Sequence, residues 1–131
     1  MTADLNVSIL VVDDSPTTIR ITRDALHDLG YKNVAMANGG NTALEMMRTK
    51  KYDLVISDWN MEPMTGYELL KYVRTSVGQI PFILMAAKVR IENVKAAKKA
   101  GANDFIAKPI NPVTLKAKID AVFADKHVIE D

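Results

Sequence analysis

The sequence contains no cysteine, and its two histidines, His27 and His127, are far apart in the chain. Disulfide bridges and thiolate metal sites are therefore excluded, and no pair of histidines has the spacing of metal ligands. No apolar run approaches the ~20 residues that a membrane-spanning helix needs, which argues against membrane insertion. The formal net charge is only +1, so bulk electrostatics does not point to nucleic acid or to an acidic membrane surface.

The N-terminal residues 1–6 also lack the basic and apolar regions of a secretory signal peptide, which favours a cytoplasmic location. A length of 131 residues, with 48% hydrophobic and 25% charged residues, is typical of one globular domain. We expect a monomeric domain over residues 7–125, with short tails at 1–6 and 126–131. Because little chain follows Phe123, we do not expect an effector domain.

Short apolar runs alternate with segments of helical spacing along the whole chain. The apolar runs, which we interpret as strands, are residues 9–12, 33–37, 54–56, 82–85 and 104–107. The last helical segment carries Leu115, Ile119 and Val122 at the spacing of an amphipathic helix. Strict alternation of strand and helix predicts a parallel sheet with helices on both faces. The fold class is therefore α/β, a flavodoxin-like (βα)5 doubly wound domain.

Local signals predict where several helices begin and end. Ser15 is a good N-cap with Pro16 at the first helical position, and Gly30 is suited to end the same helix. For the second helix, Asn41 or Thr42 is the expected cap.

Acidic residues follow two of the predicted strands. Asp13 and Asp14 follow the first strand, and Asp58 closes the third. If these strands are neighbours, the three carboxylates meet at the carboxyl edge of the sheet, where open α/β sheets bind ligands. Oxygen ligands favour a hard cation, and a few carboxylates with room for water fit Mg²⁺ better than Ca²⁺. Single acids elsewhere, such as Asp53 and Asp104, are interpreted as solvated.

Lys108 closes the fifth predicted strand, at the same edge of the sheet as the acids. A lysine ammonium is a common point-charge partner for phosphate, so Lys108 could reach an anion near Asp58. Pro109 restricts the backbone of Lys108, and we expect it to do so through a cis peptide bond.

The sequence resembles the receiver domain of two-component response regulators. The resemblance lies in the order and positions of the Asp13–Asp14 pair, Asp58 and the Lys108–Pro109 pair. The resemblance covers residues 7–125, and segments 57–61 and 64–71 are especially similar to chemotaxis members of that family. Chemotaxis, a phosphate sink and a phosphorelay shuttle are all compatible with it.

The resemblance implies phosphoryl transfer from a histidine kinase or a histidine phosphotransfer protein to the Asp58 carboxylate. It also implies a Mg²⁺ ion held by Asp13, Asp14, Asp58 and the backbone carbonyl of Asn60, with Lys108 neutralising charge on the phosphoryl oxygens. Such a protein is a phosphoacceptor that assists its own phosphorylation and dephosphorylation, and not a conventional enzyme. Its output would be a protein–protein contact on the face formed by the fourth helix, fifth strand and fifth helix.

Two positions depart from the family pattern. Ala86 stands where the family usually has Ser or Thr, and the switch position on the fifth strand is Phe105. A lost charge-assisted hydrogen bond costs about 1.5–3 kcal/mol, so conformational signalling would be weaker or use another route. Lys88 is a candidate to contact the phosphoryl group or Glu62 instead. The proline of the Asp58 loop, Pro63, lies one place later than usual.

The main alternative is a phosphorylation-independent pseudo-receiver that works as a binding module, which Ala86 favours and the intact acids oppose. A flavin or nucleotide binder of the same fold is disfavoured because no glycine-rich loop follows the first strand. A haloacid-dehalogenase-like phosphatase is disfavoured because Asn60 stands where its second acid would be.

Overall fold

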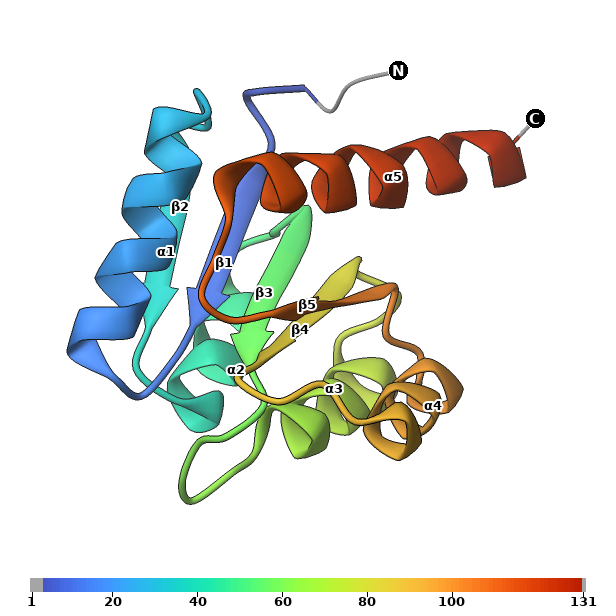
Figure 1. Cartoon of the computed structure of the whole chain (residues 1–131). Helices are drawn as coiled ribbons and strands as arrows, with labels where there is room; N and C mark the ends of the chain where they lie inside the picture. The colour runs from blue at the N-terminus through green and yellow to red at the C-terminus, as the bar shows by residue number, and fades with distance from the viewer. Residues whose placement is uncertain (1–3, 131) are drawn as a thin grey trace.

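The structure, a computed structural model, describes residues 4–130, of which 125–130 only by their backbone. Five parallel strands form one sheet in the order β2-β1-β3-β4-β5, which confirms the predicted doubly wound α/β fold (Figure 1). The elements are β1 (Ser8–Val12), α1 (Pro16–Asp28), β2 (Asn33–Ala37), α2 (Gly40–Thr49), β3 (Leu54–Asp58), α3 (Gly66–Ser76), β4 (Phe82–Ala86), α4 (Ile91–Ala100), β5 (Asp104–Ala107) and α5 (Pro112–Glu130). Helix α5 thus includes the backbone of residues 126–130; residues 1–3 and 131 of the expected tails lie outside the described chain.

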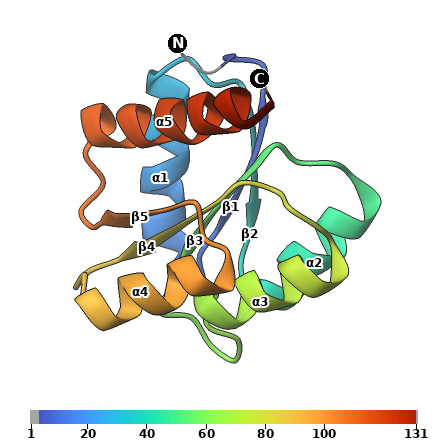
Figure 2. The ribbon, with the colours of Figure 1, turned by 90° about the vertical axis from the view of Figure 1, so that its right-hand side faces the viewer.

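Helices cover both faces of the sheet. Helices α1 and α5 lie on one face, and α2, α3 and α4 lie on the other (Figure 2). Strand residues alternate between the two apolar clusters: Ile9 and Val11 pack under α1 and α5, whereas Leu10 and Val12 pack under the other three helices. Because both faces are buried, the strands are continuous apolar runs.

The register of the strands brings the chemistry-bearing residues to one edge. Strands β1 and β3 are neighbours, with Val12 opposite Ser57, so Asp13 and Asp58 leave the sheet side by side. Ala86 and Ala107 pair at the ends of β4 and β5, and Lys108 follows directly. All these ends point the same way because every strand pair is parallel.

Most predicted helix ends are confirmed. The Ser15 hydroxyl caps α1 by accepting the Thr18 N–H (3.3 Å), and Gly30 follows α1 with a φ of 101°, a backbone region that favours glycine. The expected cap of α2 was wrong, because this helix begins at Gly40 with Gly39 as its cap. Gly40 is buried against Met64, where a β-carbon would collide with the sulfur, so packing and not side-chain capping sets this end.

At the opposite edge of the sheet, Arg74 forms a clasp that the sequence analysis did not predict. Its guanidinium donates to the backbone carbonyls of Gly78 (2.9 Å), Ile80 (2.8 Å) and Gly101 (2.8 Å), and it also contacts the Asn103 side chain. Burial lowers the pKa of Arg74. The clasp ties the end of α3 to the loops that lead into β4 and β5. None of the helices in the described chain has the length and apolar character needed to span a membrane.

Candidate functional site

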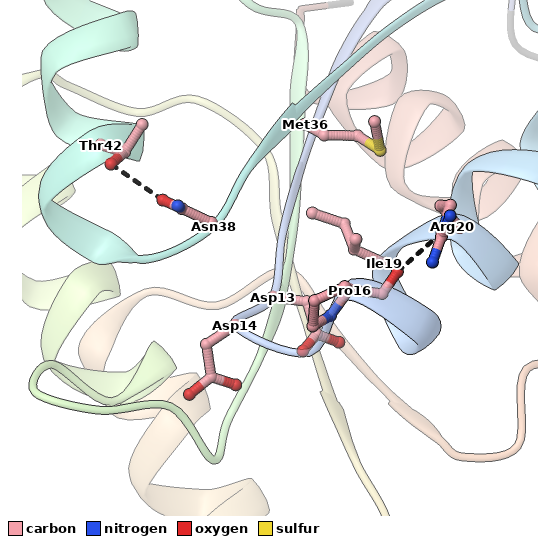
Figure 3. A pocket seen from close by; sticks show the side chains of 8 residues that line it. All are labelled: Asp13, Asp14, Pro16, Ile19, Arg20, Met36, Asn38 and Thr42. Atoms are coloured by element: carbon pink, nitrogen blue, oxygen red, sulfur yellow. Dashed lines mark hydrogen bonds between the residues drawn. The ribbon is translucent and has the colours of Figure 1, made fainter.

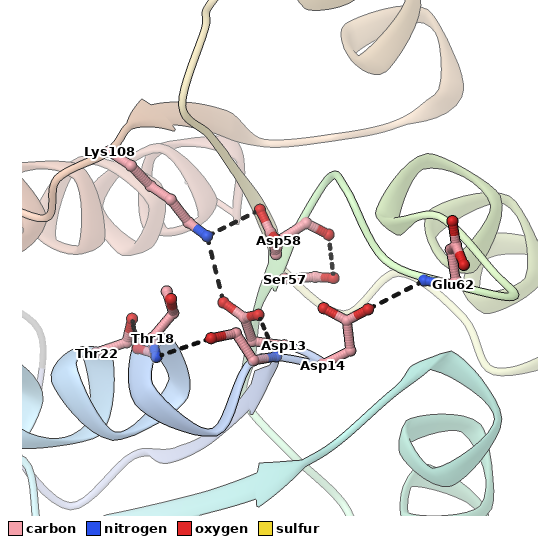
Figure 4. Close-up of polar contacts among 9 residues, drawn as sticks. Asp13, Asp14, Thr18, Thr22, Ser57, Asp58, Glu62 and Lys108 are labelled. Carbon is pink, nitrogen blue, oxygen red and sulfur yellow. Dashed lines mark hydrogen bonds and ion pairs between the residues drawn. The ribbon is translucent and has the colours of Figure 1, made fainter.

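Three carboxylates converge where β1 and β3 end. Asp13, Asp14 and Asp58 each offer one oxygen, and these oxygens lie within 4.8 Å of one another (Figure 4). Asp13 and Asp58 are only 1% and 6% exposed, whereas Asp14 lies at the surface. Such a group of hard oxygen ligands, open on one side, can hold a divalent cation. The structure therefore brings together the acids that the sequence placed at this edge.

Lys108 connects the two buried acids. Its ammonium lies 3.1 Å from Asp58 Oδ1 and 3.3 Å from Asp13 Oδ2, and its side chain is 19% exposed (Figure 4). The Lys108 N–H donates to the Ala86 carbonyl (2.9 Å), so the end of β4 fixes the backbone from which this side chain projects. The predicted cis bond between Lys108 and Pro109 is confirmed.

The Asp58 carboxylate is held in an environment that disfavours its charge. Burial raises the pKa of Asp58, and the nearby Asp13 raises it further, while Lys108 and the Asn60 N–H partly offset the increase. One cation therefore does not fully compensate two buried carboxylates and a third beside them. A divalent cation or another positive group would relieve this repulsion.

Backbone N–H groups orient the acidic pair. The Ser15 N–H donates to Asp13 Oδ1 (3.0 Å), and the Glu62 N–H donates to Asp14 Oδ2 (3.2 Å). The sequence indicated Glu62 only as a candidate contact of Lys88 and gave no sign of the role of its backbone, because main-chain donors carry no signature in residue type. The peptide bond between Glu62 and Pro63, in the loop that follows Asp58, is cis.

A hollow of about 510 Å³ lies beside the acidic pair, between the start of α1 and the end of β2 (Figure 3). Asp13 and Asp14 form part of its wall, together with the apolar side chains of Ile19 and Met36. Asp14 is exposed there, so small ions in solvent have direct access to the acids.

Gly66, at the start of α3, lets this helix approach the site closely. A β-carbon at Gly66 would collide with the backbone carbonyl of Asp58, and the Gly66 N–H donates to the Trp59 carbonyl (2.8 Å). The Trp59 N–H in turn donates to the Met85 carbonyl (2.8 Å). The backbone around Asp58 is thus held from both β4 and α3.

An aromatic row flanks the site. The half-buried Trp59 stacks on Tyr67, with ring centroids 5.2 Å apart, and its other neighbour is Phe105 at 5.8 Å. Ala86 and Phe105 are buried, at 3% and 8% exposure. The structure thus places both expected switch positions next to the site, and neither side chain carries a hydroxyl. Sequence reasoning missed Tyr67, because its partnership with Trp59 depends on the loop geometry.

Fold and site together define the class of protein. The chain belongs to the response regulator receiver domain family, whose sequence profile matches residues 9–120. It is 40% identical to the chemotaxis protein CheY-3 of Vibrio cholerae over 120 residues, which are 90% of this chain and 92% of that protein. It is 38% identical to the chemotaxis protein CheY of Pseudomonas aeruginosa over 119 residues, 89% of this chain and 96% of that one. Among solved structures, the CheY4 protein of Vibrio cholerae superimposes with a TM-score of 0.83 at 33% identity, covering 89% of this chain and 98% of that one.

Proposed function

We propose that this protein is a single-domain response regulator that accepts a phosphoryl group on Asp58 from a histidine kinase or a histidine phosphotransfer protein. The observation that carries the proposal is the position of Asp58, a 6% exposed carboxylate that contacts Lys108 at 3.1 Å and lies within 4.8 Å of two other acids. In the transfer, an Asp58 oxygen bonds to phosphorus, and the bond from phosphorus to the donor's imidazole nitrogen breaks. The electron pair of that bond stays on the nitrogen.

The donor set fits Mg²⁺. Asp13, Asp14 and Asp58 supply carboxylate oxygens, and Asn60, whose N–H already donates to the Asp58 carboxylate, would add its backbone carbonyl. When bound, Mg²⁺ neutralises charge on the acids and on the phosphoryl oxygens. The exposed Asp14 makes the site reachable, and the Glu62 N–H holds one Asp14 oxygen in place.

Lys108 positions the nucleophile and then stabilises the product. In the free protein its ammonium pairs with both buried acids, which keeps Asp58 Oδ1 in a fixed orientation. Phosphorylated Asp58 would carry up to two negative charges where the free carboxylate carries one, and the same ammonium is placed to bind a phosphoryl oxygen. Electrostatic stabilisation of this kind supplies most of the reduction in the activation barrier for phosphoryl transfer, because the protein has little covalent chemistry to perform.

The output surface that we propose is the face formed by α4, β5 and α5. This face carries two strongly exposed apolar side chains at helix starts, Ile91 (71%) and Val113 (78%). Both side chains are available for apolar contact with a protein partner. Both of the sequence relatives above are chemotaxis proteins, which supports chemotaxis as the pathway.

The proposal is tested by exposing the purified protein to Mg²⁺ and phosphoramidate, a small phosphodonor, and by measuring its intact mass. We expect a Mg²⁺-dependent increase of one phosphoryl group, which Asp58→Asn abolishes. Asp53→Asn is a matched control, because Asp53 is an exposed acid that lies outside the acidic group. Its carboxylate accepts a hydrogen bond from the Ser8 N–H (2.7 Å), which the asparagine oxygen can also accept.

A second readout is the fluorescence of Trp59, the only tryptophan, during titration with Mg²⁺ and then with beryllofluoride, a phosphoryl mimic. If neither ligand changes the fluorescence and no phosphoryl group is added, the phosphoacceptor function is wrong. The domain would then be a phosphorylation-independent binding module.

A further inference from the structure

A second hollow, of about 390 Å³, opens at the end of β4 beside the acidic site. Trp59, Asn60 and Ala86 form the side of this hollow next to Asp58. The Asn60 N–H donates to the Asp58 carboxylate, and Ala86 directly follows Met85, which is opposite Asp58 in the register of β3 and β4. The hollow therefore begins where a group attached to Asp58 would extend.

The other side of this hollow is positively charged. It is lined by Lys88 and Arg90, both exposed and both in the loop between β4 and α4. Among the described residues, no carboxylate pairs with either side chain. Arg90 is also the N-cap residue of α4, but its side chain makes no capping hydrogen bond. Two cations without partners thus face a space that Ala86 leaves without a hydroxyl.

We propose that Lys88 and Arg90 form a cationic phosphoryl-binding subsite that replaces the hydroxyl missing at Ala86. This inference rests on the proposed phosphorylation of Asp58. A phosphoryl group carries up to two negative charges, and within the described part of the site Lys108 is the one cation in contact with Asp58. A hydrogen bond to an anionic oxygen is charge-assisted whether the donor is a hydroxyl or a cation, and a cation adds Coulombic attraction, so either side chain can compensate for the hydroxyl.

The same loop offers a route for the signal to leave the site. Lys88 and Arg90 line the hollow, and their chain neighbours Val89, in the loop, and Ile91, the first residue of α4, are apolar side chains that are 48% and 71% exposed. When the two cations close on the phosphoryl group, the backbone between them moves with them, and the two apolar side chains are presented differently to a partner. In this proposal, charge at Asp58 is coupled to an apolar surface without a switch hydroxyl.

The test compares beryllofluoride affinity in the presence of Mg²⁺, measured by calorimetry, for the parent protein, Lys88→Met, Arg90→Met and the double variant. Methionine keeps an unbranched side chain of similar length and removes the charge. Lys95→Met is the matched control, because Lys95 is an exposed lysine of α4 that does not line the hollow. We expect each single variant to weaken binding about three- to tenfold, where tenfold corresponds to ~1.4 kcal/mol, and the control to bind like the parent.

A hydroxyl restored at Ala86 distinguishes a specific subsite from general charge attraction. In the Ala86→Ser background, the loss caused by Lys88→Met and Arg90→Met should shrink to less than about twofold, because the hydroxyl again binds the phosphoryl oxygen. Hydrogen exchange of the 87–90 loop should also slow on addition of beryllofluoride in the parent and not in the double variant.

Three negative outcomes can be told apart. If the parent protein binds beryllofluoride and the Lys88 and Arg90 variants bind equally well, the subsite is wrong while the phosphoacceptor function stands. An equal loss in Lys95→Met would also overturn the subsite, since it would show a long-range effect of net charge. If the parent itself does not bind beryllofluoride, the proposed function fails, and the subsite fails with it.

Discussion

Replacing Asp58 by asparagine should make the metal-free protein more stable, although it removes an ion pair. Asp58 is 6% exposed, and burial raises its pKa, so its charged form is unfavourable in the folded state. Asparagine has nearly the same shape and can still accept a hydrogen bond. The variant keeps the contact between Lys108 and Asp13 (3.3 Å), so no buried charge is left without a partner.

The magnitude follows from the distances. At an effective dielectric constant of about 20, the Lys108–Asp58 pair at 3.1 Å attracts by roughly 5 kcal/mol. Asp13, within 4.8 Å, repels Asp58 by at least roughly 3.5 kcal/mol, and the exposed Asp14 adds a smaller, screened repulsion. These terms nearly cancel, which leaves the desolvation of the buried carboxylate as the deciding cost. We expect the free energy of unfolding to rise by about 1–2 kcal/mol.

The assay is urea unfolding in EDTA, at neutral pH and at lower pH. Because the pKa of Asp58 is higher in the folded state, the folded protein binds more protons between the two pKa values. The penalty is therefore absent below the unfolded pKa of about 4 and grows as pH rises through the folded value. The advantage of Asp58→Asn should accordingly disappear toward pH ~4. The stability difference between the variant and the parent should also become smaller in Mg²⁺, because Mg²⁺ at 100 times its Kd for the parent protein stabilises the parent by about 2.7 kcal/mol.

Glu45→Gln serves as the control for this experiment, because Glu45 is an exposed acid of α2. The free energy of unfolding of this variant should stay within about 0.5 kcal/mol of the parent value. A lower stability of Asp58→Asn in EDTA would refute the reasoning. It would show that the Lys108 ion pair outweighs desolvation and repulsion together.

Two further changes test how the rest of the fold supports the site. Arg74→Met should lower the free energy of unfolding by about 2–4 kcal/mol, because three backbone carbonyls lose their hydrogen-bond donor. Its beryllofluoride affinity should stay unchanged. A loss of stability below about 1 kcal/mol would mean that water replaces the Arg74 hydrogen bonds. Gly66→Ala should weaken both Mg²⁺ and beryllofluoride binding in calorimetry, because the new β-carbon displaces the backbone carbonyl of Asp58. Gly40→Ala is the control: its β-carbon contacts only the flexible Met64 side chain, so both affinities should stay near those of the parent protein. Equal affinities in the two glycine variants would contradict this difference.

The acidic site could be predicted from sequence because parallel strands that end in acid must bring those acids to one edge. Asp13, Asp58 and Lys108 each follow or close a strand buried on both faces, and the register of β1, β3, β4 and β5 brings their ends together. Because these strands are apolar on both faces, the polar residues at their ends, and not an alternating pattern, mark where each strand leaves the sheet. Only the order of the strands had to be assumed, and the observed β2-β1-β3-β4-β5 order agrees with it.

Contacts made by the backbone, or by side chains far apart in sequence, could not be predicted in this way. The Glu62 N–H that holds Asp14 and the carbonyls that Arg74 binds are main-chain groups, which any residue type provides. The start of α2 at Gly40 depends on packing against Met64, which residue propensities do not contain. Helix caps were predictable where a side chain does the capping, as at Ser15, and not where packing decides.

The arrangement at the strand ends is not explained by stability. Two buried carboxylates share one lysine, a third carboxylate lies beside them, and a glycine is needed to fit α3 against the same loop. Elsewhere in the described chain the core is mainly apolar, with Thr22, the Tyr31 hydroxyl and the Arg74 guanidinium as polar exceptions. Departures from local folding rules that collect at one edge are expected where a protein binds a ligand. The repulsion among the acids is free energy that a cation can release on binding, and this released energy is what links occupancy of the site to the state of the fold.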